Sequence, residues 1–402
     1  MTRVLVRWIV VVILIAHGLL HLLGAAKGLS WAEVATLTDP ITPALGVVWL
    51  AAAIALVVTG VLFAARARMW WVAGFVGLLT SQAVILTSWG DAKAGTLANL
   101  VLLGALGYEL ASNGPRSYRA EYRRRVATAL PVSAPDTVSI VSEADLARLP
   151  APVAEYIRRS GAVGQPRVSS LLATIHGRIR ASATSRWMTY TGEQVNTYGR
   201  TPSRLFWMDA TMFGLPVDVL HVFVGESATM RVRLCSALRM VNSAGPEMDR
   251  AETVTLFNDL CILAPAALVD APIAWREVDD THVQGVFSNG AQTVSADLFF
   301  HDGDLVDFRS DDRMSTSPDG STFTPQPWST PVSDYRVFGA RRLATHGEGR
   351  WHAAAPQGEF AYLEYNLDAI TYNTGTGTGT AGVAETDRQE RVRPSAGADH
   401  RL

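Results

Sequence analysis

The sequence predicts an α-helical bundle of four membrane spans followed by a soluble α+β domain. Charged residues are nearly absent from 8–65 and 69–106 and become ordinary from Ser142 onward. Such asymmetry is typical of a membrane module joined to a globular one. After Val168, apolar residues alternate with a period of two in successive short segments, and one stretch with helical spacing interrupts them. This order favours a curved antiparallel sheet or half-open barrel with inserted helices.

Four apolar segments in the first third of the chain predict the spans. They cover about 4–23, 44–64, 70–89 and 96–110, and roughly 20 residues are needed to cross the hydrocarbon of a bilayer. The fourth segment is the shortest, contains Asn99 and has Glu109 near its end. Its leucines favour insertion, and an asparagine opposes insertion less than a charge would. We therefore expect a four-helix transmembrane module at 1–111.

Arginines in the loops predict the orientation of the spans. They lie before the first span, between the second and third, and after the fourth: Arg3, Arg7, Arg66, Arg68, Arg116, Arg119, Arg123, Arg124 and Arg125. The other side has only Lys27 and Lys93, each with acidic residues nearby. By the positive-inside rule, we expect the N-terminus and the soluble domain in the cytoplasm. If the fourth segment did not cross, the domain would lie on the other side.

Polar side chains inside the spans are functional candidates, because hydrocarbon disfavours them. His17 and His21 are four residues apart and project from one face of the first helix. They predict either a polar seam that bonds to Ser81, Gln82 or Asn99 across the bundle, or a site for a small molecule, a quinone or a metal. The spans offer no evident third ligand, so we expect no metal.

The remainder of the chain divides into three parts. Residues 112–141 are expected to form a basic juxtamembrane linker, and its arginine-rich part, 115–129, is a candidate helix for the surface of anionic lipid. Residues 142–373 predict the soluble domain. The glycine–threonine repeat and polar residues that follow predict a disordered tail at 374–402.

Turn residues divide the soluble domain into its elements. Ser142 and Asp145 have the spacing of a helix cap, and Pro150 and Pro152 interrupt a helix expected over 146–160. Between the strands, 246–269 predicts a helix with a kink near Pro265. Strands are expected at 171–180, 187–198, 204–212, 217–224, 228–234, 282–287, 293–300, 305–310, 332–337, 350–354 and 360–372.

Composition and missing motifs exclude several functional classes. The formal net charge of −2 gives no basic excess, so we expect no nucleic-acid partner. The chain has no Gly-x-Ser-x-Gly elbow, Walker loop, His-Glu-x-x-His or Cys-x-x-Cys motif. The glycine–threonine repeat near Gly375 does not join a strand to a helix, so it is no nucleotide loop. We expect no cofactor, and the sequence leaves open whether the protein is an enzyme.

Several polar residues of the soluble domain are weak catalytic candidates. Asp218 and His221 lie three apart on one predicted strand, which puts them on opposite faces and argues against a direct dyad. Glu193 lies in an apolar and aromatic strand. The cluster Asp311, Asp312 and Arg313 predicts either a site for a cation or substrate, or a solvated turn with an internal ion pair.

Other residues are candidates for binding an apolar ligand. They are aromatic, flexible or capable of bidentate hydrogen bonding: Trp187, Met188, Gln194, Trp207 and Arg309. The same aromatic and methionine residues also fit an ordinary hydrophobic core. The density of such side chains therefore predicts either a core or a cavity that accepts lipid.

The order of motifs along the chain is specific. The motifs include His17-Gly-Leu-Leu-His21, Thr87-Ser-Trp-Gly-Asp-Ala-Lys93, Leu149-Pro-Ala-Pro-Val153, Arg186-Trp-Met188, Leu263-Ala-Pro-Ala-Ala-Leu268, Pro327-Trp-Ser-Thr-Pro331 and Ile370-Thr-Tyr-Asn373. Over about nine tenths of the chain they resemble an uncharacterised bacterial family of four-span membrane proteins with a C-terminal soluble domain of unknown function. The resemblance implies a bacterial plasma membrane protein. In outline, the inserted helices and curved sheet are also similar to lipoprotein carriers of the LolA/LolB type, which implies a cavity for acyl chains.

Three functions are compatible with these observations. The first is a membrane-anchored module that binds an apolar small molecule, such as a lipid or a quinone, beside the lipid bilayer. The second is a membrane-tethered enzyme, which requires at least three of the catalytic candidates to meet in one cleft. The third is a scaffold for a partner protein, which requires an exposed apolar patch.

Overall fold

The computed structural model describes residues 2–130, 139–317 and 319–375. The chain divides into two compact units. The helical unit consists of Met1–Ala120 with two hairpin turns, Phe213–Leu215 and Cys235–Ala237. The β-rich unit contains the rest. Part of the expected linker and nearly all of the expected tail fall at 131–138 and 376–402, outside the described residues.

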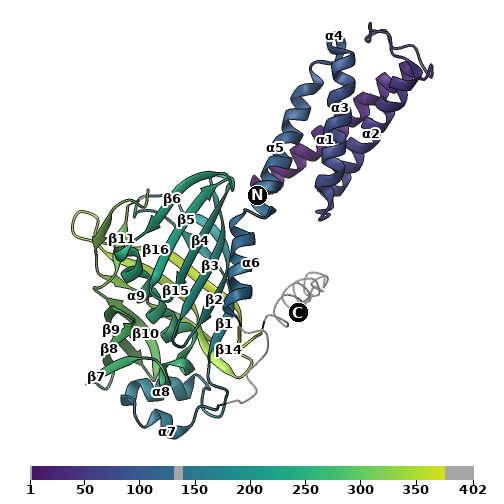
Figure 1. Ribbon diagram of the computed structural model, residues 1–402. Coiled ribbons are helices and arrows are strands. Elements are labelled where there is room, and N and C mark those ends of the chain that lie inside the picture. Colours follow the sequence, from purple (N-terminus) through teal and green to yellow (C-terminus); the bar gives the residue numbers. More distant parts are fainter. Residues whose placement is uncertain (1, 131–138, 318, 376–402) are drawn as a thin grey trace, which may run out of the picture. The chain divides into compact units, whose positions relative to one another are not determined.

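Long apolar helices form the helical unit (Figure 1). They are α1 (Thr2–Gly28), α2 (Pro43–Ala64), α3 (Trp70–Thr87) and α5 (Gly95–Asn113), with the short α4 (Trp89–Ala92) before α5. Helices α1, α2 and α3 are long and apolar enough to cross a membrane. The fourth expected span corresponds to α5, which contacts α1 and α3. Its crossing of the membrane stays a prediction.

The surface of the helical unit is apolar and its interior is partly polar. Leu20, Phe75 and Leu86 are each more than half exposed, whereas His17 and Asn99 are buried. Soluble proteins rarely leave so many large apolar side chains on one surface. Membrane bundles do so because lipid solvates the outside, while hydrogen bonds join the helices within.

The β-rich unit contains one large antiparallel sheet. Its 14 strands follow the order β6-β5-β4-β3-β2-β1-β16-β15-β13-β10-β9-β8-β7, and β14 pairs with β15 beside this path. The first half consists of β1 (Ser170–Ile179), β2 (Met188–Thr197), β3 (Ser203–Met212), β4 (Leu215–Val224), β5 (Ser227–Leu234) and β6 (Leu238–Ala244). The second half consists of β7 (Ile273–Asp279), β8 (His282–Asn289), β9 (Gln292–His301), β10 (Asp304–Ser310), β13 (Trp328–Ser329), β14 (Val332–Phe338), β15 (Arg341–His352) and β16 (Glu359–Tyr372). Strands β6 and β7 are the two edge strands, and they do not pair with each other in the described residues, so the sheet is not closed. Figure 1 shows that the sheet is curved, as expected for a half-barrel.

Pairing of the first and last strands joins the two halves. Leu171 of β1 lies opposite Tyr372 of β16. Beyond this pair, the Asn373 side chain accepts a hydrogen bond from the backbone N–H of Ser169 at 2.8 Å. A separate small ribbon of β11 (Met314–Thr316) and β12 (Phe323–Pro325) follows β10.

Two short helices precede the sheet where the prolines predict a break. Helix α7 covers Glu143–Leu146 and α8 covers Ala151–Arg159, so the expected helix over 146–160 is two helices. Ser142 and Asp145 form the expected cap, with the Ser142 N–H donating to Asp145 at 2.9 Å. Gly161 ends α8 with a φ of 72°, which glycine adopts without strain.

Helix α9 (Pro246–Leu263) lies on the concave side of the sheet and contacts strands of both halves (Figure 1). The five-residue 3-10 helix η1 (Pro265–Val269) follows directly, which places the break where Pro265 predicts it. From Ala251 to Leu263, protein surrounds α9 on every side, so its buried residues include polar ones such as Glu252 and Asp259. Hydroxyls of Tyr156 and Tyr372 donate to the carbonyls of Cys261 and Leu263 near its end, which satisfies groups that the helix itself leaves unbonded.

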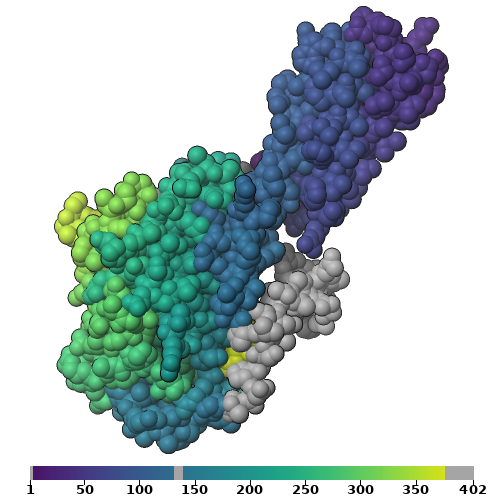
Figure 2. Space-filling view, in the orientation of Figure 1, coloured from purple at the N-terminus to yellow at the C-terminus, as the bar shows by residue number. Residues whose placement is uncertain are grey.

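The basic helix candidate is α6 (Tyr118–Ala129). Within the β-rich unit, Glu121 accepts a hydrogen bond from Arg231 of β5 at 2.7 Å, and Tyr122 is buried. Figure 2 shows this helix in close contact with the neighbouring strands. One side of α6 therefore packs on the outer face of the sheet.

The strand predictions are wrong for β15, β6 and β7, and they also omit the short strands β11, β12 and β13. Strand β15 covers Arg341–His352 instead of 350–354, and the unpredicted part contains Gly347 and Gly349. Both glycines lie beneath the rings of Tyr365 and Tyr362 on β16, where an added Cβ would come within 3 Å of the ring. Strands β6 and β7 are absent from the prediction. They are the two edges of the sheet, and edge strands show weaker alternation because more of their side chains meet solvent.

Candidate functional site

A cavity of about 330 Å³ lies between α9 and the concave face of the sheet in the β-rich unit. Ligand sites in proteins commonly have volumes of about 300–1,000 Å³. Its apolar wall includes Phe206, Trp351 and four of the nine methionines of the chain, Met208, Met230, Met248 and Met314. Methionine is flexible and polarisable, so such a wall adapts to apolar ligands of different shapes.

A buried ion network forms the polar part of the wall. Arg204 of β3 donates to Asp259 at 2.7 Å and to Glu252 at 3.1 Å, both on α9. The three side chains are between 3% and 9% exposed. Burial alone would lower the pKa of Arg204, but Asp259 and Glu252 raise it above its ordinary value. The arginine is therefore charged and held by two carboxylates from one helix face.

Two amides complete the surroundings of Asp259. Gln194 and Asn196 of β2 donate to the same carboxylate oxygen at 2.7 and 3.0 Å. Alternate residues of a strand share a face, so both amides point to the concave side. With Arg204, this oxygen accepts three hydrogen bonds, which stabilise the charged form of a buried carboxylate.

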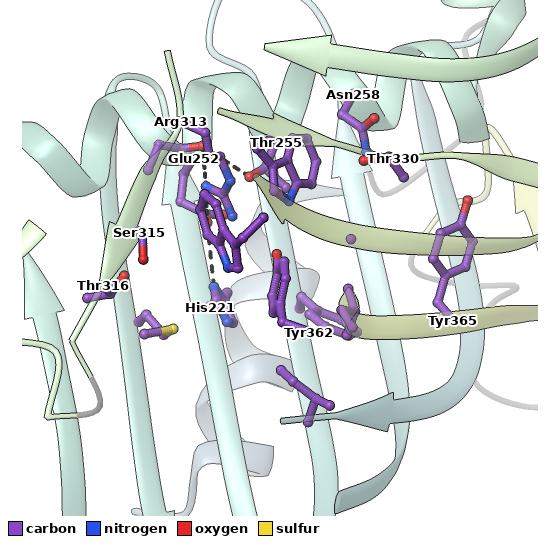
Figure 3. Close-up of a pocket in the computed structure, with 18 of the residues that line it drawn as sticks. His221, Glu252, Thr255, Asn258, Arg313, Ser315, Thr316, Thr330, Tyr362 and Tyr365 are labelled. Atoms are coloured by element: carbon purple, nitrogen blue, oxygen red, sulfur yellow. Dashed lines mark hydrogen bonds and ion pairs between the residues drawn. The ribbon is translucent and has the colours of Figure 1, made fainter. Parts of the chain in front are cut away.

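The second carboxylate, Glu252, lies between a histidine and another arginine. His221 Nδ1 of β4 is 3.8 Å from Glu252, and Arg313, which follows β10, is 3.6 Å from it (Figure 3). Burial raises the pKa of Glu252, but Arg204, His221 and Arg313 together hold it below its ordinary value. Burial lowers the pKa of His221 to about 4, an effect that Arg204 and Arg313 reinforce and Glu252 opposes. His221 is therefore neutral at pH 7.

Several buried polar atoms on the cavity wall have no hydrogen-bond partner among the described residues. They are Nδ1 of His221, Oδ1 of Asn258, Nε of Arg313, Nε1 of Trp328, Oγ1 of Thr330 and the hydroxyl of Tyr365. Four of these residues, Asn258, Trp328, Thr330 and Tyr365, are at least nine tenths buried. Buried polar groups normally find partners, so this concentration around one cavity makes it the candidate binding site.

The cavity contains two of the six catalytic candidates from the sequence, His221 and Arg313. Asp218 lies on the same strand as His221 but does not line the cavity, as alternation predicts. Glu193 lies close enough to Tyr122 of α6 to interact with its hydroxyl electrostatically. This places Glu193 on the outer face of the sheet.

Asp311 and Asp312 do not line the cavity either. Asp312 accepts hydrogen bonds from Ser295 at 2.6 Å and from Arg250, so it fixes the loop after β10. Asp311 is exposed. The ion pair of Asp312 is with Arg250 of α9 and not with Arg313, so the ion pair expected within the cluster is not the one that Asp312 makes.

The ligand-binding candidates divide in the same way. Gln194 lines the cavity, whereas Trp187, Met188, Trp207 and Arg309 do not. Trp187 stacks between Arg178 and Arg180, with their guanidinium carbons 4.6 and 4.4 Å from its ring centre. Arg309 pairs with Asp307 and stacks on Phe299. Trp207 is next to Phe206 on β3, so it faces away from the cavity.

The sequence prediction does not include Arg204, Glu252 or Asp259. One signal could have revealed the acidic pair, because Glu252 and Asp259 are seven residues apart in an apolar helix and therefore share a face. No sequence signal links them to Arg204, which is 48 residues away from Glu252 and on another element.

In the helical unit, the polar residues of the spans bond to one another. His17 Nε2 is 3.1 Å from the Ser81 hydroxyl and 3.2 Å from the side-chain oxygen Oδ1 of Asn99. Asn99 donates to Gln82 at 3.0 Å, and Gln82 donates to Thr96 at 3.3 Å. His21 Nδ1 is 3.0 Å from the His17 carbonyl. The described residues contain no group of three or more potential metal ligands.

Fold and cavity together define a class: a protein with apolar helices suited to a membrane and a curved-sheet domain with a partly polar internal cavity. Within that class, the chain belongs to the family of unknown function DUF6544. The model of that family matches residues 139–365, more than half of the chain and most of the β-rich unit. No curated protein matches the chain.

Two solved structures show partial similarity. One is a putative outer membrane lipoprotein-sorting protein domain from Vibrio parahaemolyticus, with 12% identity and a TM-score of 0.29, covering 56% of this chain and 91% of that one. The other is a DUF1329 family protein from Desulfovibrio piger, with 10% identity and a TM-score of 0.31, covering 56% and 93%. At TM-scores of 0.29 and 0.31, these similarities say nothing about the ligand or the function of this chain.

Proposed function

We propose that this protein binds an apolar small molecule, of the lipid or quinone type, in the cavity of its β-rich unit. The observation that carries the proposal is the cavity itself, with its methionine-rich wall and its concentration of unpartnered polar atoms. An ordinary core would be packed without such space and would pair its polar groups. The membrane helices supply the surroundings from which an apolar ligand enters.

Binding is better supported than catalysis. The enzyme hypothesis requires three of the candidates Asp218, His221, Glu193, Asp311, Asp312 and Arg313 in one cleft, and only His221 and Arg313 line the cavity. His221 is also held apart from a hydrogen bond with Glu252, at 3.8 Å. A scaffold for a partner protein stays a prediction.

The proposed membrane arrangement has four spans, with α5 as the fourth. Its 19 residues extend about 28 Å at 1.5 Å per residue, close to the thickness of the hydrocarbon. Its polar residue Asn99 is buried among the other helices instead of facing lipid. An even number of crossings puts both ends of the module on the arginine-rich, cytoplasmic side of a bacterial plasma membrane.

Mass spectrometry of molecules retained by the gently extracted full-length protein tests the binding proposal. We expect a lipid or quinone to be retained by the wild type. Substitution Met230→Trp fills part of the cavity and should reduce retention about tenfold, because the ligand loses space. The matched control is Met240→Trp on β6, which is 46% exposed and does not line the cavity. No retained molecule in the wild type, or equal loss in both variants, would contradict the proposal.

Thiol labelling of intact cells tests the arrangement in the membrane. Val337 of β14 is 68% exposed and Trp31, between α1 and α2, is 63% exposed. In a Cys235→Ser background, an impermeant maleimide should label Trp31→Cys in intact cells and Val337→Cys only after permeabilisation. Labelling of Val337→Cys from outside would show that the number of crossings is odd or the orientation reversed.

A further inference from the structure

The charged and polar groups of the cavity wall restrict which head group a ligand can have. Two arginines, Arg204 and Arg313, face two carboxylates, Glu252 and Asp259, within one connected network. Every member of this network is close to nine tenths buried or more. The positive and negative charges are equal in number, and His221 contributes none because burial lowers its pKa to about 4.

We infer that the cavity selects an uncharged amphipathic molecule whose head both accepts and donates hydrogen bonds, and rejects an anion with the same chain. This inference rests on the proposed binding function. A monoacylglycerol or a fatty amide has such a head, whereas a fatty acid is ionised at neutral pH.

The balance of charge is the reason for rejecting an anion. A buried charge is unfavourable unless a partner compensates it. An anion near Arg313 would find that arginine already shared with Glu252, whose carboxylate would repel it. Protonation of His221 could supply the missing positive charge, but its lowered pKa opposes this at neutral pH.

One further cation lines the cavity, and its surroundings differ. Arg180 is only partly buried, donates to the carbonyls of Ala183 and Ala361 at 2.7 Å, and stacks on Trp187. Its partners are neutral and leave its charge in place, but solvent reaches the partly exposed guanidinium and screens its attraction for a buried anion.

The unpartnered atoms describe the head that fits. Arg313 Nε and Trp328 Nε1 are both donors, and the guanidinium carbon of Arg313 lies 5.2 Å from the centre of the Trp328 ring. They require an acceptor, such as a carbonyl or ester oxygen. Asn258 Oδ1 is an acceptor and requires a hydroxyl or N–H. The hydroxyls of Thr330 and Tyr365 can take either role.

A competition between monoolein and oleate tests the inference, because the two share one chain and differ in head charge. Full-length protein in detergent is offered equal amounts of both at pH 7.5, and native mass spectrometry measures the occupancy of each. We expect monoolein to be preferred at least tenfold. Equal binding, or a preference for oleate, would overturn the inference and leave the proposed function intact. If neither molecule binds, the inference is also overturned, whereas the proposed function fails only if the extracted wild type retains no apolar molecule at all.

A charge variant makes the test more specific. Glu252→Gln removes one negative charge and leaves an arginine uncompensated, so the preference should shift towards oleate at least tenfold. The matched control is Glu193→Gln, on the outer face of the sheet, which should leave the preference unchanged. A Glu252→Gln variant that folds and keeps the wild-type preference would also overturn the inference. If that variant does not fold, the wild-type competition still decides.

Discussion

The two units of this protein each bury a polar cluster, and the clusters differ in how completely they are bonded. In the helical unit, His17, Ser81, Asn99 and Gln82 form a chain of mutual hydrogen bonds, and beside it Nε2 of His21 and Nε1 of Trp49 have no partner among the described residues. In the β-rich unit, the network around Arg204 is charged and borders a cavity, and six nearby residues have a buried polar atom without a partner. The first arrangement joins helices, and the second leaves bonding capacity for something else.

The role of a buried polar residue can be inferred from the hydrogen bonds that it makes and not from its residue type alone. His17 and His221 are both histidines among polar neighbours, and sequence alone makes both of them candidates. His17 has two partners from two other helices. His221 Nδ1 has none within hydrogen-bonding distance in the described residues. The hydrogen bonds of His17 therefore fit a structural role, whereas the unbonded Nδ1 of His221 fits a role in binding a ligand.

The largest expected effect follows removal of the central cation. Arg204→Met should destabilise the β-rich unit by about 3–5 kcal/mol, because it leaves two carboxylates buried without their partner. The measurement is urea unfolding of the full-length protein in detergent, followed by near-UV circular dichroism. Arg178→Met is the matched control: this exposed arginine pairs with Glu364 at the surface, where water screens the pair, so its loss should have a much smaller effect. Equal effects would remove the contrast between buried and surface ion pairs.

A smaller effect is expected from the protonation of His221. Its pKa is lowered from 6.5 to about 4 in the folded protein, so the unfolded chain binds the proton first. The stability that the neutral ring confers is present above pH 6.5 and is lost as the pH falls towards 4. The loss is on the order of 3 kcal/mol, since each pKa unit corresponds to about 1.4 kcal/mol.

Unfolding of the wild type and of His221→Asn at several pH values between 7.5 and 4.5 measures this loss. The wild type should lose stability relative to the variant over that window. Parallel curves would mean that folding leaves the pKa of His221 unchanged, which would contradict its lowering by burial.

The smallest effect is expected in the helical unit. Asn99→Leu removes the hydrogen bonds to His17, Ser81 and Gln82 and should cost about 1–2 kcal/mol, because hydrogen bonds between membrane helices contribute modestly. Unfolding in sodium dodecyl sulfate measures this cost, and retention of ligand should not change. Loss of ligand in this variant would assign the binding site to the seam instead of the cavity.

Much of the architecture could be predicted because its signals are local. Long apolar runs predict α1, α2 and α3, and period-two alternation predicts most strands of the sheet. The break between α9 and η1 follows from Pro265, since proline lacks the N–H that continues a helix. Where local signals were weak, as on the edge strands β6 and β7, prediction failed.

The site required the tertiary structure. From the sequence, Gln194, His221 and Arg313 are site candidates only together with several residues that do not line the cavity. The alternation of side chains along a strand could exclude Asp218 from these candidates. The helical spacing of 246–269 predicts a helix with one apolar face, but α9 is enclosed on all sides from Ala251 to Leu263. Two of its acidic residues, Glu252 and Asp259, therefore point into the protein, where a surface helix would expose them.

By itself, the sequence determined the apolar helices, the alternating strands and the proline breaks, because each depends on residues close together in the chain. The tertiary structure alone decided which charges meet. Arg204, Glu252 and Arg313 come from β3, α9 and the segment after β10, and only the curvature of the sheet around α9 brings them to one cavity. Burial then makes their pairing obligatory, since charges removed from water are stable only when partners compensate them.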